Sequence, residues 1–421
     1  MKRSSFGELF LLILAMLFFT QPAAARIKLA ALPQRELVEI QLDNSNYTLA
    51  EEERIVPLLK STAKTGNNLI DFSWSNTQID KNSIQFRPLA ISTGESFRPL
   101  KKVSPRGGGE MVDEVNVISV SYPPNENALV WEVYAHDACA VKVRVSYLIS
   151  NLSRNFSYRA LSNKDETMLL LKNYLELRNY SGEDFGISGI WAGFGEQFNK
   201  QVGQQEEIKM LIHLFKSVLI EKTFTFNWYE HGPLNNDKPF ASKILMHYKL
   251  TNDDEHGMGL FPLQPGKVRI FIDDGHGGEA FLGEDWAKLT PLDSEMKLYL
   301  GEARDIICTR TIEENERHHI RSNLYNQEIV IKYEIENYKN KPVTLQIIEM
   351  MNKIGQEYFG NTHGDVEWEK GHKTSKNINF IYKQGQVLPV LQVDLPANEK
   401  VKNDAVKKQV AKFHFTIKNL W

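Results

Sequence analysis

Residues 267–310 read KVRIFIDDGHGGEAFLGEDWAKLTPLDSEMKLYLGEARDIICTR. Apolar residues alternate with polar ones in this stretch, and turns rich in Gly and Asp interrupt the alternation. Period-two alternation broken in this way is typical of β-strands joined by hairpins. The stretch therefore predicts four strands, at residues 268–272, 280–282, 296–300 and 306–308. The DDGHGG segment between the first two predicts a hairpin loop, because it lacks the ligand spacing of a calcium loop.

The same pattern extends over most of the chain. Strand-like runs occupy residues 37–42, 54–59, 69–74, 83–87, 115–122, 129–134, 139–147, 156–160, 167–178, 328–336, 343–348, 378–382, 387–393 and 413–417. No alternation of strands with helices appears, so no parallel sheet is indicated. We predict a mainly β protein made of several antiparallel β-sandwiches, with an Ig-like C-terminal unit. Residues 205–217 fit both a helical stripe and a strand face, and the sequence leaves them open.

Composition shifts and turns suggest four segments. We expect a signal peptide at residues 1–25 and an N-terminal β domain at 26–125. A central β-rich domain at 126–303 and an Ig-like β-sandwich at 304–421 would follow. The chain has 421 residues, which is long enough for two or three domains.

The first 25 residues predict secretion. Lys2 and Arg3 precede an apolar run at residues 9–19, and small residues end the segment at Ala25. This order is typical of a cleaved signal peptide, which places the mature chain outside the cell or in the periplasm. The alternative is a membrane anchor, but the apolar run is short for a bilayer. No later segment reaches about 18 apolar residues, so we expect no transmembrane segment in the mature chain.

Charge and cysteine content narrow the functional classes. The formal net charge is -3 and no Lys/Arg cluster forms a basic face, so a nucleic acid partner is not expected. The two cysteines, Cys139 and Cys308, both lie in strand-like runs. An oxidising compartment permits a disulfide between them, and two buried free thiols are the other interpretation.

A family resemblance rests on a turn and on the pieces that follow it. Residues 179–185 read NYSGEDF and resemble the N-x-S-G-E-D-aromatic turn of a domain of unknown function. That domain occurs in secreted bacterial proteins and in proteins called mucoidy-inhibitor-like. The resemblance covers about residues 125–420, and it implies a secreted, mostly β protein without catalytic residues that can be transferred. Further pieces that resemble the family in order are residues 265–271, 281–286, 300–301, 333–337 and 341–343.

Two sets of residues are candidates for a binding site. His363, Asp365 and Glu367 alternate, so a strand would place them on one face, and such ligands suit a divalent metal such as zinc. The other interpretation is the solvated face of an edge strand. Trp191 and Trp286 are candidates for ligand stacking, although most tryptophans of a β-sandwich lie in the core. No catalytic fingerprint is present and no cofactor is expected.

The function that fits these features best is a binding or structural one. We expect a secreted, non-enzymatic structural or interaction protein of the bacterial cell envelope, with an envelope protein or polysaccharide as partner. The alternative is a carbohydrate-active or metal-dependent envelope hydrolase, which would need a cleft lined by paired carboxylates or a bound metal.

Overall fold

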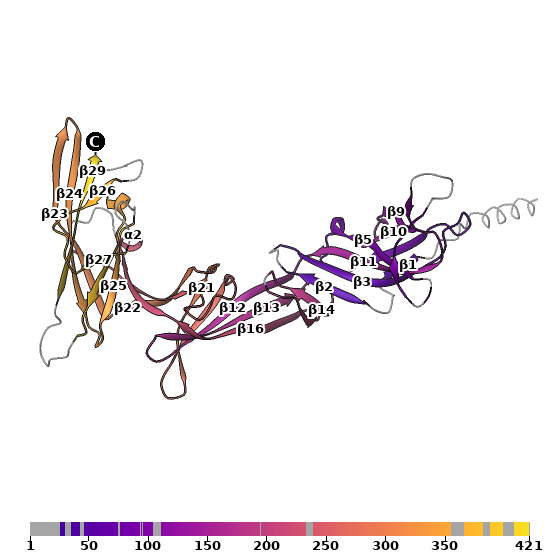
Figure 1. The fold of residues 1–421 in the computed structure, drawn as a ribbon, viewed down its shortest axis with the longest axis horizontal. Helices are drawn as coiled ribbons and strands as arrows, with labels where there is room; N and C mark the ends of the chain where they lie inside the picture. The colour runs from indigo at the N-terminus through magenta and orange to yellow at the C-terminus, as the bar shows by residue number, and fades with distance from the viewer. Residues whose placement is uncertain are drawn as a thin grey trace, which may run out of the picture. The chain divides into compact units, whose positions relative to one another are not determined.

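A computed structural model describes residues 26–29, 35–42, 46–74, 76–92, 94, 96–103, 111–193, 195–232, 239–354, 366–381, 388–398 and 408–420. Regular structure in these residues is almost entirely β-strand (Figure 1), so the protein is mainly β, as predicted. The predicted signal peptide lies outside the described residues. The chain divides into two compact units: unit 1 contains Met1–Asn155 and Leu175–Met210, and unit 2 contains Phe156–Tyr174 and Leu211–Trp421.

Unit 1 is built from two sheets. The first has the strand order β1-β4-β10-β9 and the second the order β15-β14-β2-β3-β11-β5-β6, beside a small β7-β8 pair. A short 3-10 helix, η2, precedes β5. The elements are β1 (Arg26–Lys28), β2 (Leu37–Gln41), β3 (Thr48–Leu58), β4 (Asn68–Ser73), η2 (Lys81–Ser83), β5 (Gln85–Ser92), β6 (Arg98–Pro99), β7 (Lys102–Val103), β8 (Val112–Asp113), β9 (Val115–Ser121), β10 (Ala128–Ala135), β11 (Cys139–Ile149), β14 (Gly186–Trp191) and β15 (Phe198–Val202).

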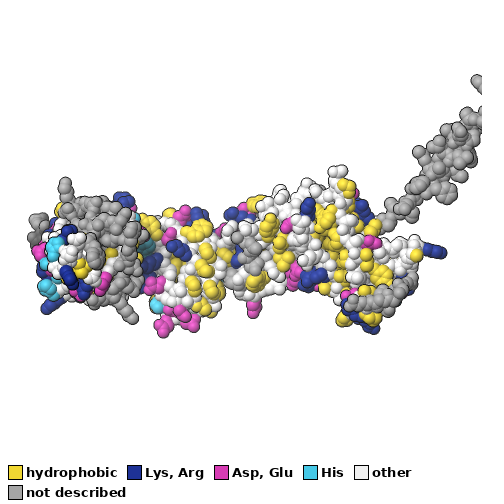
Figure 2. All heavy atoms as spheres, turned by 90° about the horizontal axis from the view of Figure 1, so that it is seen from above, with side chains coloured by type: hydrophobic (Ala, Val, Ile, Leu, Met, Phe, Trp, Pro, Cys, Tyr) yellow, Lys and Arg dark blue, Asp and Glu magenta, His cyan; other side chains and the backbone are white. Residues whose placement is uncertain are grey.

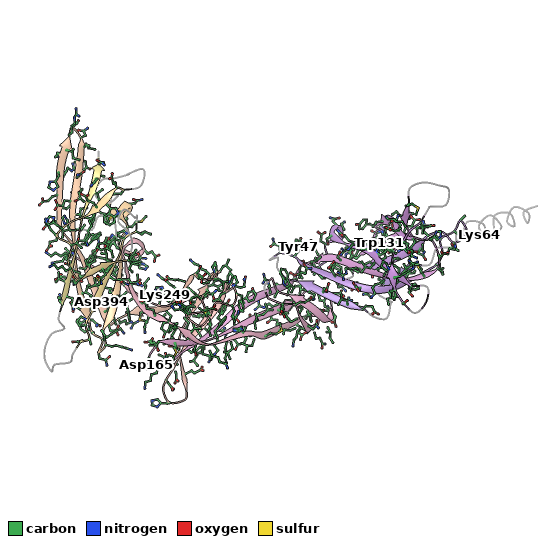
Figure 3. The ribbon with its side chains drawn as sticks, in the orientation of Figure 1. Tyr47, Lys64, Trp131, Asp165, Lys249 and Asp394 are labelled. Atoms are coloured by element: carbon green, nitrogen blue, oxygen red, sulfur yellow. The ribbon has the colours of Figure 1, made fainter. Side chains whose placement is uncertain are left out.

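Aromatic side chains join the two sheets of unit 1. Trp131 on β10 (labelled in Figure 3) is 2% exposed, and its ring centroid lies 4.8 Å from that of Phe86 on β5. Phe72 on β4 lies 5.6 Å from Tyr147 on β11, measured in the same way. Burial of such large rings between two sheets is the main stabilising contribution to a sandwich of this kind.

Unit 2 contains a second sandwich and most of a further sheet. The sandwich consists of the sheets β22-β19-β17-β25-β28-β27 and β18-β23-β24-β29-β26. The further sheet has the order β16-β13-β12-β20-β21, and β12, β13 and β16 have residues in both units. The elements are β12 (Leu152–Ser162), β13 (Met168–Asn179), β16 (Glu206–Leu219), β17 (Glu221–Asn227), α2 (Trp228–His231), β18 (Phe240–Ala241), β19 (Ile244–Thr251), β20 (Gly266–Asp273), β21 (Glu279–Ala287), β22 (Glu295–Ala303), β23 (Ile306–Arg321), β24 (Leu324–Asn337), β25 (Val343–Ile348), β26 (Trp368–Lys370), β27 (Ile378–Phe380), β28 (Val390–Leu395) and β29 (Gln409–Leu420).

The core of unit 2 holds a buried ion pair among apolar side chains. Arg310 on β23 pairs with Glu349 at the end of β25, and their side chains are 1% and 0% exposed. Tyr333 donates a hydrogen bond to the same carboxylate at 2.7 Å. The Arg310 guanidinium also stacks on the ring of Trp228, 3.9 Å from its centroid. Two charges in such a place need these partners, because an unpaired buried charge is strongly unfavourable.

The two units do not follow the domain boundaries that we expected at residues 125 and 303. β10 pairs with both β9 and β4, so a cut at residue 125 would divide one sheet. β22 pairs with β19 in the C-terminal sandwich, so that sandwich begins well before residue 304. In both sandwiches, strands that lie far apart in the sequence pair with one another. Local composition does not indicate such pairing. The Ig-like topology of residues 304–421 stays a prediction.

The structure tests the predicted strands, the ambiguous segment and the direction of strand pairing. The four strands predicted within residues 267–310 are confirmed as β20, β21, β22 and the start of β23. Of the ambiguous residues 205–217, all but Gln205 lie in strand β16, so the apolar stripe at helical spacing was misleading there. The sheets of the described residues are mostly antiparallel, but they include the parallel pairs β1–β4, β12–β20, β14–β2 and β17–β25. Each of these pairs lies in a sheet that also contains antiparallel pairs, so none of the described sheets is parallel throughout.

The DDGHGG segment forms the turn of the β20–β21 hairpin, as predicted. Gly275 and Gly277 have φ of 77° and 86°, a left-handed conformation that glycine adopts at little cost. The Asp274 carboxylate accepts hydrogen bonds from the backbone N–H groups of His276, at 2.7 Å, and Gly278, at 3.0 Å. The Asp274 carboxylate is therefore engaged in hydrogen bonds that stabilise the loop.

Candidate functional site

One face of the β20–β21 hairpin in unit 2 is the best candidate for a binding surface. Val268 and Ile270 on β20 are 1% and 0% exposed, so they define the inner face. Side chains alternate along a strand, and Lys267, Arg269 and Phe271 therefore point to the outer face. On this outer face Arg269 is exposed, and Lys267 and Phe271 are half-buried.

Strand pairing adds three side chains from β21 to this face. Lys267 lies opposite Trp286, Arg269 opposite Glu284, and Phe271 opposite Phe281. A register shift between Ile270 and Phe271 brings Phe281 onto the same face as Glu284 and Trp286. We define the β20–β21 face by six residues: Lys267, Arg269, Phe271, Phe281, Glu284 and Trp286.

The β20–β21 face combines exposed rings with charged groups. Trp286 is 60% exposed and Phe281 is 59% exposed. The Glu284 carboxylate lies 3.2 Å from the Lys267 ammonium and 3.9 Å from the Arg269 guanidinium. The two rings offer apolar faces for stacking, while the charged groups beside them offer hydrogen bonds. Such a surface suits a sugar ring or a side chain of another protein.

The aromatic end of the face is held in place from β12. The Arg159 guanidinium stacks on the ring of Phe271, 4.4 Å from its centroid, and pairs with Glu279. The centroids of Phe271 and Phe281 are 5.4 Å apart, with an edge-to-face tilt of 62°. Stacked and paired side chains lose little further freedom when a ligand binds, which favours affinity.

The two tryptophans predicted to stack on a ligand differ in their surroundings. Trp191 on β14 is half-buried in unit 1, and its carbonyl accepts a hydrogen bond from the backbone N–H of Leu42 at 2.9 Å. Trp286 belongs to unit 2 and is mostly exposed. Only Trp286 therefore presents an open ring face, and the two residues belong to separate units.

The predicted metal ligands are only partly described. His363 and Asp365 lie outside the described residues. Glu367 is exposed, and its carboxylate accepts a hydrogen bond from the Asn419 side chain at 2.9 Å. Across the described ranges, no group of three or more His, Cys, Asp or Glu side chains is placed to hold a metal ion. The metal site stays a prediction.

Both cysteines are free thiols in the structure. Cys139 on β11 is half-buried in unit 1, and Cys308 on β23 is 0% exposed in the core of unit 2. Burial raises the pKa of both thiols, and Glu114 and Glu349 respectively add to the rise. Pairing of the two cysteines in the oxidised protein stays a prediction.

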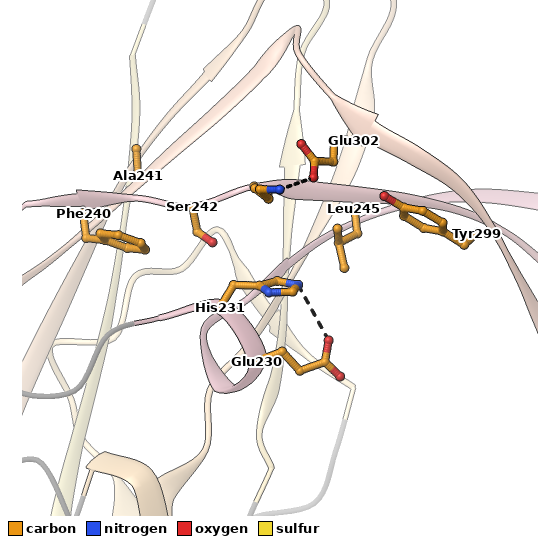
Figure 4. A pocket seen from close by; sticks show the side chains of 9 residues that line it. Glu230, His231, Phe240, Ala241, Ser242, Leu245, Tyr299 and Glu302 are labelled. Atoms are coloured by element: carbon orange, nitrogen blue, oxygen red, sulfur yellow. Dashed lines mark hydrogen bonds and ion pairs between the residues drawn. The ribbon is translucent and has the colours of Figure 1, made fainter. Parts of the chain in front are cut away.

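A hollow of about 680 Å³ in unit 2 was not foreseen from the sequence. Its lining comes from α2, β18, β19, β22 and the link between β18 and β19. Figure 4 shows Ser242, His231 and Glu230 on its wall. His231 Nε2 is 3.8 Å from the Glu230 carboxylate, which exceeds hydrogen-bond length, and Lys243 is 2.5 Å from Glu302. Among the residues that the structure describes, no hydrogen bond joins Ser242 to His231, so a nucleophile and its base are not assembled.

Sequence reasoning found Trp286 and missed its neighbours. The alternation in residues 267–271 placed Lys267, Arg269 and Phe271 on one face, and this signal was available. The register shift that adds Phe281 has no local sequence signature, because it arises from pairing between two strands. On the side that Figure 2 shows, hydrophobic side chains in yellow are interspersed with charged ones of both signs.

Comparison with known proteins leaves the family open. Within the described residues, no helix has the length and apolar character needed to cross a membrane. A scan against models of known protein families finds no match, and a search of the curated proteins finds no significantly similar sequence. The resemblance of residues 179–185 to a domain of secreted bacterial proteins therefore stays a prediction.

Proposed function

We propose that this chain is a secreted, non-enzymatic interaction protein of the bacterial cell envelope that binds an envelope protein or glycan. The observation that carries the proposal is the β20–β21 face, with Trp286 and Phe281 exposed beside charged side chains. Exposed rings of this kind are enriched at binding surfaces, because they bury a large area with few rotatable bonds. The predicted signal peptide supports the location, and the predicted Ig-like topology of residues 304–421 would fit a binding module.

Tryptophan fluorescence provides the first test. Purified protein would be titrated with a panel of soluble envelope polysaccharides and, in a separate arm, with soluble envelope proteins. We expect one arm to quench the fluorescence in a saturable way. Trp286→Ala should weaken that binding at least about tenfold, which is the loss of a contact worth ~1.4 kcal/mol.

A matched control removes an exposed side chain elsewhere. Ile187 on β14 is 77% exposed and lies in unit 1. Ile187→Ala should leave binding unchanged, because Ile187 does not belong to the β20–β21 face. Binding that is equally strong in both variants, or saturable binding in neither arm, would count against the proposal.

The alternative function is an envelope hydrolase, and the hollow in Figure 4 is the observation that favours it. Ser242, His231 and Glu230 supply the residue types of a nucleophile, a base and an orienting acid. Assays on ester, peptide and glycoside substrates would test this function. Turnover that survives repurification and disappears in Ser242→Ala would establish the hydrolase over the binding protein.

A further inference from the structure

Strand β9 of unit 1 is a sheet edge that lacks the usual protection. It pairs with β10 on one side and, in the described part of the chain, with no strand on the other. Backbone N–H and C=O groups on its free side are therefore open to a further strand. The β9 sequence, VNVISVS, contains no charged residue and no proline.

The other long edges of the described sheets carry charges. Each edge strand longer than three residues, apart from β9, contains at least one Lys, Asp or Glu: β15 has Lys200, β16 has Glu206 and Lys209, β21 has Glu279 and Glu284, and β22 has Glu295 and Lys297. Charged edge residues prevent unwanted pairing, because a partner strand would have to bury them. β9 is thus the long edge on which a partner strand meets no such penalty.

Apolar side chains on and beside β9 favour a partner. Ile118 is 54% exposed, Val120 is 47% exposed, and Tyr122, directly after the strand, is 52% exposed. A register shift against Glu132 and Val133 leaves Ile118 without a residue opposite it on β10. Natural edges use such bulges as protection, but this one exposes an isoleucine rather than a charge. A strand placed alongside would cover these three side chains.

We infer that β9 pairs in antiparallel fashion with β9 of a second copy of this chain. A two-fold axis places residues of one strand opposite residues of the same strand, so any charge in β9 would face a like charge or lie near one. The absence of charge removes that repulsion. A charged partner strand would gain no ion pair from β9, so an uncharged strand such as β9 itself fits best. The pairing joins two copies of the β1-β4-β10-β9 sheet into one continuous sheet.

The test is the oligomeric state of the full chain. Sedimentation velocity over a range of protein concentrations should show a monomer and a closed dimer whose share rises with concentration. Val120→Lys should raise the dimer dissociation constant at least tenfold, because it brings two like charges to the interface. Ser121→Lys is a second variant that removes no apolar contact and should act in the same direction.

Controls separate this pairing from other causes. Ala280→Lys adds the same charge to the β21 edge in unit 2 and should leave the dimer intact. Far-UV circular dichroism of each variant confirms folding. Single cysteines at residues 116–120, in a Cys139→Ser background, should crosslink two copies across the two-fold axis.

Three results would overturn the inference. The first is a wild-type chain that is monomeric at all concentrations, which would leave an uncharged strand of another protein as the occupant of β9. The second is an open series of larger assemblies in place of a closed dimer. The third is a dimer that both lysine variants leave unchanged.

Discussion

Removal of the buried carboxylate at Glu349 should destabilise unit 2 strongly. Its oxygens lie 2.9 Å from Arg310 Nε and 3.2 Å from Arg310 Nη2, and it accepts a hydrogen bond from Tyr333. Glu349→Gln leaves the Arg310 charge in the core without a counter-ion. Breaking one partner of a buried pair costs about 3–5 kcal/mol. This exceeds the ~1 kcal/mol of an ordinary hydrogen bond, so the unpaired charge dominates the effect.

Hydrogen exchange of the amides in β23 and β24 is a suitable assay, because those strands form the centre of their sheet. The expected loss corresponds to exchange that is about two to four orders of magnitude faster. Replacing both partners, as in Arg310→Met with Glu349→Leu, should recover most of the stability, since no buried charge remains. The exposed Lys243–Glu302 pair is the control, and Glu302→Gln should leave exchange close to wild type. Acceleration below tenfold in Glu349→Gln, or a double variant as unstable as the single one, would refute the reasoning.

Three further predictions concern thiols, acid and a turn. A thiol reagent should label Cys139 slowly and Cys308 only after unfolding, because burial protects Cys308 and raises its pKa; two unreactive cysteines in denaturant would instead show a disulfide. Burial alone would raise the pKa of Glu166, but hydrogen bonds from Lys222 and Tyr248 outweigh it and the pKa is lowered. The stability that Glu166 contributes is therefore present above the ordinary carboxyl pKa and is lost as pH falls through the lowered pKa. The free energy of unfolding in urea should depend less on pH between about 5 and 3 in Glu166→Gln than in the wild-type chain. An equal pH dependence in the two proteins would contradict this prediction. Gly182→Ala should lower the thermal midpoint of unit 1 more than Gly186→Ala does. Both glycines have a positive φ, and an alanine in that conformation costs about 1–3 kcal/mol. Only at Gly182 would the added Cβ also lie 2.1 Å from the Asn76 carbonyl oxygen. Equal shifts in the two variants would show that this close approach does not matter.

The prediction at Gly182 also bears on the resemblance of residues 179–185. Asn179 donates hydrogen bonds to the carbonyls of Glu183, at 2.8 Å, and Gly203, at 2.9 Å, while Ser181 donates to the Asn179 side chain. The polar residues of the turn thus stabilise one another and the adjacent chain. Their spacing has a structural cause in this protein, which is independent of any function shared with a family.

The candidate site shows how far sequence reasoning reaches. Trp191 and Trp286 were both predicted as candidates for ligand stacking from their residue type. The structure separates them, because Trp191 is half-buried and Trp286 is 60% exposed. Residue type does not determine exposure, which depends on what packs over each strand. The hollow near Ser242 was missed for the same reason, since its lining comes from elements far apart in the chain.

The sequence by itself determined the local structure. Alternation marked the strands, and Gly and Asp marked the hairpin of β20 and β21, because side-chain direction and turn conformation depend on neighbouring residues. Only the tertiary structure decided which strands pair, as in the parallel β12–β20 contact, and which edges remain open, as at β9. Those outcomes depend on distant segments competing for the same hydrogen bonds and the same apolar surface. The buried Arg310–Glu349 pair belongs to this second class, since its residues lie 39 positions apart and only the folded core brings them together.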